Sequence, residues 1–237
     1  MIYEIADLRI DIQNRCPFTT KFCAEYLSAD QSAPAHFSVC VTDEEFLAEK
    51  AISANFSDGY IENICLYRNL CLKAPSYNRI LMHACVLELD GEGYAFLGKS
   101  GTGKSTHSRL WLSTFPDAFI VNGDKPLLSF DGDTVYAHGT PWMGKEGMGC
   151  NAKTPLKGLC FLRQAKENRI RKLTQAEAVH LLFGQLLIPK EEGNAIKTLE
   201  LADKILQKVP AYLLDCDISQ EAVKTSYEAL TQKPFLK

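Results

Sequence analysis

Alternating apolar and polar positions run through the first twelve residues, a pattern with the period of two that half-buried strands show. A short run rich in β-branched residues, 36–42, predicts another strand. Apolar residues then recur at helical spacing and predict helices over 44–54 and 61–73, with Thr42 or Asp43 as the N-cap of the first and Pro75 ending the second. The first third of the chain therefore predicts small α+β elements.

From residue 79 the strand-like runs are longer and more apolar. Residues 79–89 and 93–98 predict two strands of a hairpin, because the Asp90-Gly91 pair between them is a strong turn signal. A helix is expected over 103–113, and three more helices over 174–187, 195–208 and 219–231, with N-caps at Thr174 and Ser219. Further strands are expected over 118–122, 125–130, 134–138, 156–162, 169–173 and 211–217. This order predicts an α/β fold with a mixed sheet.

Composition narrows the class of protein. The chain has 237 residues, of which 46% are hydrophobic, enough for one large domain with a smaller appendage. A net charge of −3 argues against a nucleic-acid-binding surface. Glu4 and Asp7 interrupt the segment where a signal peptide would need an apolar core, and the longest apolar runs are too short to cross a membrane. Nine cysteines without a CxxC pair indicate reduced thiols, and we expect a cytoplasmic protein that binds neither membrane nor nucleic acid.

One motif points to a chemistry. The segment from Gly98 to Ser105 fits G-x-x-x-x-G-K-[ST], the Walker A pattern, and it stands between a predicted strand and a predicted helix, as a P-loop requires. Its glycines allow the backbone amides to surround phosphate groups, while Lys104 reaches the β- and γ-phosphates and Ser105 binds Mg²⁺. The predicted nucleotide-binding residues are Gly98, Lys99, Ser100, Gly101, Thr102, Gly103, Lys104, Ser105 and Thr106.

A carboxylate closes the next predicted strand. The apolar run 119–122 is followed by Gly123 and Asp124, about one helix after the P-loop. A nucleotide-binding domain needs a metal ligand or a base at that place. We therefore expect Asp124 to bind Mg²⁺ together with Ser105, to accept a proton, or both.

These residues together resemble the catalytic domain of HPr kinase/phosphorylase, and the nucleotide-binding half of ATP-dependent phosphoenolpyruvate carboxykinase. The resemblance covers residues 79–175 and is most specific at the P-loop. In the kinase a strand with His-Gly precedes the P-loop, and His83 stands at the matching distance here. The family's next strand ends in two aspartates, whereas this chain has Gly123 and Asp124, so one carboxylate is missing. The resemblance implies a small stand-alone kinase-like protein that uses ATP and Mg²⁺, and it implies self-association into a homo-oligomer.

A glycine-rich segment, residues 136–151, follows these strands. It has too many glycines for a helix or strand, and a costly loop of this kind is often functional. We predict a substrate loop with Lys145 contacting the transferred phosphate and His138, Trp142 and Glu146 in supporting roles. The alternative is a structural turn packed by Pro141 and Trp142.

The sequence as a whole predicts two parts, with α+β elements over 1–76 packed on a P-loop kinase-like domain over 77–237. The predicted function is transfer of the γ-phosphoryl group of ATP to a hydroxyl of a protein, a peptide serine or a small molecule, with Asp124, Lys104, His83 and Lys145 as catalytic residues. Two alternatives stay open. The chain could be a nucleotide-binding regulator or degenerate kinase without turnover, or a carboxykinase-like enzyme acting on a small carboxylic acid.

Overall fold

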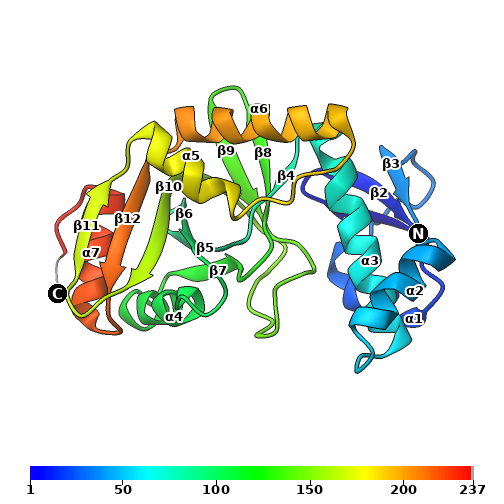
Figure 1. Ribbon diagram of the computed structural model, residues 1–237, viewed down its shortest axis with the longest axis horizontal. Helices are drawn as coiled ribbons and strands as arrows, with labels where there is room; N and C mark the ends of the chain where they lie inside the picture. The colour runs from blue at the N-terminus through cyan, green and yellow to red at the C-terminus, as the bar shows by residue number, and fades with distance from the viewer. Residues whose placement is uncertain (236–237) are drawn as a thin grey trace.

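The computed structural model describes residues 1–235 and contains two sheets (Figure 1). The smaller sheet holds β1 (Ile2–Ile5), β2 (Leu8–Ile12) and β3 (Phe37–Val39), with β1 and β2 antiparallel and β3 parallel to β2. The turn between β1 and β2 places Ala6 and Asp7 at φ 54° and 60°, the left-handed conformation of a tight hairpin. The alternation in the first twelve residues is thus the apolar face of a hairpin.

Helices cover one side of this sheet. They are α1 (Pro17–Phe22), α2 (Asp43–Ile52) and α3 (Asp58–Lys73), with short 3₁₀ turns η1 (Ala24–Tyr26) and η2 (Ala74–Tyr77). Tyr3 and Ile10 of the sheet and Leu66 and Leu70 of α3 belong to one buried cluster. Thr42 caps α2 through a complete capping box, which settles the choice between Thr42 and Asp43. Burial of one face of α3 therefore fixes these helices on the small sheet.

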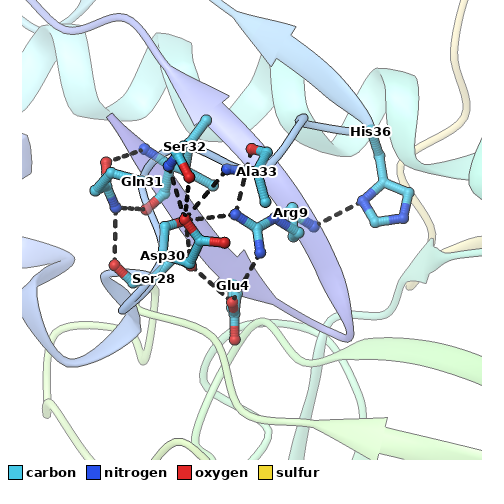
Figure 2. Close-up of polar contacts among 9 residues, drawn as sticks. Glu4, Arg9, Ser28, Asp30, Gln31, Ser32, Ala33 and His36 are labelled. Atoms are coloured by element: carbon cyan, nitrogen blue, oxygen red, sulfur yellow. Dashed lines mark hydrogen bonds and ion pairs between the residues drawn. The ribbon is translucent and has the colours of Figure 1, made fainter.

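Contacts of Arg9 hold the segment between β2 and β3 against the small sheet (Figure 2). Its guanidinium donates to the carbonyl oxygens of Asp30 and Ala33 and lies 3.8 Å from Glu4. The Arg9 amide donates to His36 Nδ1 at 2.9 Å. These bonds satisfy backbone groups of residues 30–36, which form no helix or strand.

The larger sheet has nine strands in the order β4-β8-β9-β10-β6-β5-β7, with β12 beside β10 and β11 beside β12. Its strands are β4 (Ile80–Leu81), β5 (Ala84–Leu89), β6 (Glu92–Leu97), β7 (Phe119–Asn122), β8 (Leu127–Asp131), β9 (Thr134–His138), β10 (Lys153–Gln164), β11 (Arg169–Lys172) and β12 (Ala211–Cys216). The long β10 pairs antiparallel with β9 at its start and parallel with β6 and β12 further on. The sheet is therefore mixed and curled around β10.

Two pairs of helices cover the two faces of this sheet (Figure 1). The pairs are α4 (Lys104–Thr114) with α7 (Gln220–Thr231), and α5 (Gln175–Phe183) with α6 (Glu192–Lys208). Alternate residues of β5 point to opposite faces, so Val86 packs in the α5–α6 cluster and Leu87 in the α4–α7 cluster. An α/β fold with a mixed sheet is confirmed.

Several predicted boundaries need correction. The run 79–89 is two strands, since Met82 and His83 interrupt it between β4 and β5. The helix predicted from 174 to 187 ends at Phe183, and the one predicted from 195 begins at Glu192, where the Glu191 carboxylate accepts from two backbone amides. Ser219 precedes α7 as predicted, but its side chain donates to Asp217 and does not cap the helix.

The cysteines and the helices bear on two further predictions. All nine cysteines, which lie within 1–235, are free, and six of them are buried. None of the helices described is both long enough and apolar enough to cross a bilayer.

Candidate functional site

The direction of three neighbouring strands brings distant residues to one edge of the large sheet. β6 and β7 are both antiparallel to β5, so β6 and β7 run in the same direction. The ends of β6 and β7 and the beginning of β5 therefore lie at the same edge. The glycine-rich loop (residues 98–103), Asp124 and His83 follow or precede these three strand ends directly.

The glycine-rich loop depends on its glycines. Gly98, Gly101 and Gly103 have φ values of 151°, 82° and 108°, a region that side chains disfavour. Lys104 is the first residue of α4, and its Nζ donates back to the Gly98 carbonyl oxygen at 2.8 Å. Burial lowers the pKa of Lys104, although the charge of Asp124 opposes the shift. The amides at the start of α4 and this lysine together make the loop electropositive.

Asp124 and His83 form a hydrogen-bonded pair at this edge. His83 Nε2 lies 3.1 Å from Asp124 Oδ1, and Lys125 Nζ lies 3.2 Å from Asp124 Oδ2. Burial raises the pKa of the Asp124 carboxyl, but the His83 hydrogen bond and the Lys125 charge outweigh it, so the net pKa lies below the ordinary value. Asp124 is therefore ionised at neutral pH and able to hold a cation or accept a proton.

Asn122 orders the turn that carries Asp124, and the sequence analysis did not identify it. Its Oδ1 accepts from the amides of Asp124 and Lys125 at 2.9 and 2.6 Å, and its Nδ2 donates to Thr140 Oγ1 at 3.0 Å. The side chain is completely buried. A polar amide that ends an apolar strand before Gly-Asp is the signal for such an Asx turn.

Gly123 is in contact with the loop 143–148. Its amide donates to the Met148 carbonyl oxygen at 2.8 Å, and a Cβ at this position would lie 2.9 Å from that oxygen and 3.2 Å from the Met143 carbonyl oxygen. A Cβ at Gly144, whose φ is 77°, would lie 2.8 Å from the Cβ of Asp124. The loop 143–148 therefore packs directly on the Asp124 turn and leaves no space for a second carboxylate.

These elements enclose a cavity of about 430 Å³. Most of the predicted site residues line it, namely His83, Ser100, Gly101, Gly103, Lys104, Ser105, Thr106, Asp124, Lys145 and Glu146. Gly98, Lys99 and Thr102 belong to the same loop but do not line the cavity. Glu146 is 2.5 Å from Arg109 of α4, so an ion pair joins the 143–148 loop to the helix that follows the glycine-rich loop.

The structure separates two residues of the predicted substrate loop from this cavity. His138 is the last residue of β9, and its Nε2 is 2.7 Å from Ser129 Oγ in the protein interior. Burial lowers the pKa of His138 to about 4, and the residue lines a different cavity together with Asp7 and Lys153. The strand predicted over 134–138 is confirmed as β9, and the substrate role predicted for His138 is wrong because its side chain lies in the protein interior.

Trp142 is also buried, as the alternative of a packed turn predicts. Its ring lies 4.8 Å from the ring of Tyr67 and 6.4 Å from that of Phe22, measured between centroids. Both partners come from helices of the small sheet. Trp142 therefore fixes the beginning of the 143–148 loop against α1 and α3.

The donor set for a cation is small. Within residues 1–235 no group of three or more His, Cys, Asp or Glu side chains is arranged to hold a metal ion. Ser105 and Asp124 line the same cavity and supply a hydroxyl and a carboxylate oxygen. Such a pair suits a cation that also binds phosphate oxygens and water.

The comparisons with known proteins identify no family for this chain. No family model matches the chain, and no curated protein matches it. Among solved structures, it is similar to the Hpr(Ser) kinase/phosphatase from Coxiella burnetii, with 12% identity and a TM-score of 0.35 over 64% of this chain and 93% of that one. With so low a TM-score, this likeness is only a distant one and establishes no activity.

Proposed function

We propose that this chain is a phosphotransferase that uses ATP and Mg²⁺ and moves the γ-phosphoryl group to a hydroxyl. One observation carries the proposal. A single cavity is lined by Lys104 and Ser105 of the motif and by Asp124 with its partner His83, although these residues come from three separate strand ends. Phosphoryl transfer requires this combination of phosphate-binding groups and a carboxylate.

The glycine-rich loop fits a triphosphate. Its glycines at positive φ allow the backbone amides to surround phosphate groups, and α4 adds the positive end of an eleven-residue helix. Lys104 is only 8% exposed and already held by the Gly98 carbonyl oxygen, so its ammonium group is oriented before a ligand arrives. Such pre-oriented charge stabilises the transferring group at little cost in reorganisation.

Ser105 Oγ and the Asp124 carboxylate are the groups that would hold Mg²⁺, which neutralises phosphate charge when bound. Asp124 is ionised and takes the proton of the acceptor hydroxyl, while His83 orients it through the 3.1 Å contact. The acceptor oxygen forms a bond to the γ-phosphorus as the bond to the bridging β,γ-oxygen breaks, and ADP leaves. Lys145 lies on the same cavity and offsets charge on the phosphoryl oxygens.

Calorimetry with Mg·ATP on the purified chain tests the first step. We expect binding by the unchanged chain, a loss of tenfold or more in Lys104→Ala because a charge-assisted contact is removed, and no change in the exposed control Lys166→Ala. Asp124→Asn should bind ATP and form no ADP with any acceptor. Absence of ATP binding, or equal binding by Lys104→Ala, would overturn the proposal.

A second candidate, a nucleotide-binding regulator without turnover, has one observation in its favour. The 143–148 loop occupies the place where the resembled family has a second aspartate, so Asp124 has to act alone. ATP binding by the unchanged chain, together with no phosphorylated product from any hydroxyl acceptor, would favour this candidate over the transferase.

A further inference from the structure

A second cavity, of about 610 Å³, adjoins the first. The two share Asp124, Met143, Gly144 and Lys145, so the Asp124 turn stands between them. The other walls of the second cavity come from α1, α3, the segment around Trp142, Leu81 of β4 and Leu187. A molecule bound there would lie on the opposite side of Asp124 from the glycine-rich loop.

Aromatic rings form much of the lining of the second cavity. Phe22, Tyr60, Tyr67 and Trp142 all line it, and the rings of Tyr67 and Trp142 lie 4.8 Å apart with an interplanar angle of 41°. Aromatic rings contribute a large apolar contact area and favour flat partners, which pack on them in stacked or edge-on geometry. The lining therefore fits a planar ring.

The charges of the lining residues indicate what else the ligand carries. Three cationic side chains, Arg68, Lys125 and Lys145, line the cavity with a single carboxylate, that of Asp124, so the lining has more positive than negative charge. Arg68 is paired with Glu49 outside the cavity, and Lys125 with Asp124. Lys145 has no ion-pair partner in the described part of the chain. An acidic group on the ligand would complement it.

We propose that the second cavity binds the phosphoryl acceptor, and that this acceptor is a small molecule with a planar ring, an acidic group and a hydroxyl. The inference rests on the proposed phosphotransferase function. A volume of about 610 Å³ suits a small molecule. Its hydroxyl gives its proton to the Asp124 carboxylate and its oxygen bonds to the γ-phosphorus, while the bond to the β,γ-bridging oxygen breaks.

Binding can be measured without nucleotide through the fluorescence of Trp142. The probe is 4-(hydroxymethyl)benzoate, with benzyl alcohol, which lacks the acid, and glycolate, which lacks the ring, as matched fragments. We expect the complete probe to bind about tenfold more tightly than either fragment, since it makes both kinds of contact. Trp142→Phe should remove the signal, because the other tryptophan, Trp111, belongs to α4 and is completely buried in the cluster that α4 forms with α7, away from the cavity.

Two substitutions test the location. Phe22 is 39% exposed, so Phe22→Ala should fold, and we expect it to weaken probe binding about fivefold. Phe183→Ala removes an exposed ring on α5 outside the cavity and should have no effect. ATP binding should be unchanged in Phe183→Ala. Ile64→Trp, which fills the cavity from α3, should abolish probe binding.

The outcomes separate this inference from the proposed function. If ATP binds but the probe binds no better than its fragments, or Phe22→Ala equals Phe183→Ala, the acceptor site is overturned alone. If ATP displaces the probe, the cavity holds part of the nucleotide, which also overturns it. If the probe binds as expected and ATP does not, the phosphotransferase is overturned while the binding site stands. ADP formation stimulated by the probe and lost in Asp124→Asn would support both.

Discussion

Replacing Gly123 by aspartate would restore the adjacent carboxylates of the resembled kinase family, and we expect it to lower both stability and activity. A Cβ at this position would lie 2.9 Å from the Met148 carbonyl oxygen and 3.2 Å from that of Met143. Both neighbours are backbone atoms, so a side chain cannot turn aside to relieve the contact. The carboxylate would also stand close to two carbonyl oxygens, which repel it.

The size of the effect follows from these contacts. Displacing the 143–148 loop loses the 2.8 Å hydrogen bond from the Gly123 amide to the Met148 carbonyl oxygen, worth about 1 kcal/mol. Overpacking adds about 1–3 kcal/mol. We therefore expect Gly123→Asp to lower the free energy of unfolding by about 2–4 kcal/mol. ADP formation should fall at least tenfold, because the displaced loop carries Lys145.

Urea unfolding and an ADP-release assay on the same preparations measure both quantities. Gly123→Ala is the matched control, since it adds the Cβ without the charge, and it should fall between the unchanged chain and Gly123→Asp in stability. An aspartate variant as stable as the unchanged chain and faster in turnover would refute the reasoning. It would show that the loop yields readily and that Asp124 alone limits the reaction.

Three further predictions concern single side chains. His83→Ala removes a hydrogen bond that lowers the pKa of Asp124, so the acid limb of kcat/KM against pH should move to higher pH, and an unmoved limb would contradict the pairing. Asn122→Ala should lower the free energy of unfolding by about 2–4 kcal/mol in urea, because the amides it holds lose their acceptor, whereas an unchanged midpoint would show that water replaces it. Burial lowers the pKa of His107 and of His138 to about 4, so the unfolded chain binds more protons than the folded chain below pH 6.5. Urea unfolding should therefore show the free energy of unfolding falling by about 3 kcal/mol per histidine between pH 6.5 and 4. A flat profile would show that the folded chain accommodates the charged histidines.

Local signals predicted much of the fold. Asp90 and Gly91 have φ values of 55° and 76°, and the hairpin that they join is the one expected from the sequence. The capping boxes at Thr42 and Thr174 mark true helix starts. Each of these features depends on a few consecutive residues, and for that reason it can be recognised without knowledge of the rest of the chain.

Pairing between distant strands could not be predicted in this way. The apolar run of β10 covers 158–162, yet the strand begins at Lys153, pairs there with β9, and pairs with β12 from Leu159 onward. Apolar periodicity says which face of a strand is buried and nothing about which strand lies beside it. The curl of the sheet, and with it the shared edge of β5, β6 and β7, became apparent only in the structure.

The candidate site likewise contains one part that the sequence predicts and another part that depends on contacts between distant residues. The glycine-rich loop is a local motif, whereas the positions of His138 and Trp142 depend on Ser129 and on Tyr67, far from them in the sequence. The strand predicted over 134–138 ends at His138, as β9 does. The strand pattern does not show which residue of a neighbouring strand a polar side chain meets, and for that reason the sequence predicts a substrate role for His138 that the structure contradicts.

Helices α1 and α3, which cover the small sheet, contribute directly to the candidate site. Phe22 and Tyr67 hold Trp142, and the next residues of the same segment, Met143 to Lys145, pack on Asp124 and border both cavities. A change in α1 or α3 would thus reach the Asp124 turn through Trp142 without touching the glycine-rich loop. In the proposed transferase, α1 and α3 thus contribute to acceptor binding together with the Asp124 turn, while the loop at the end of β6 binds the donor.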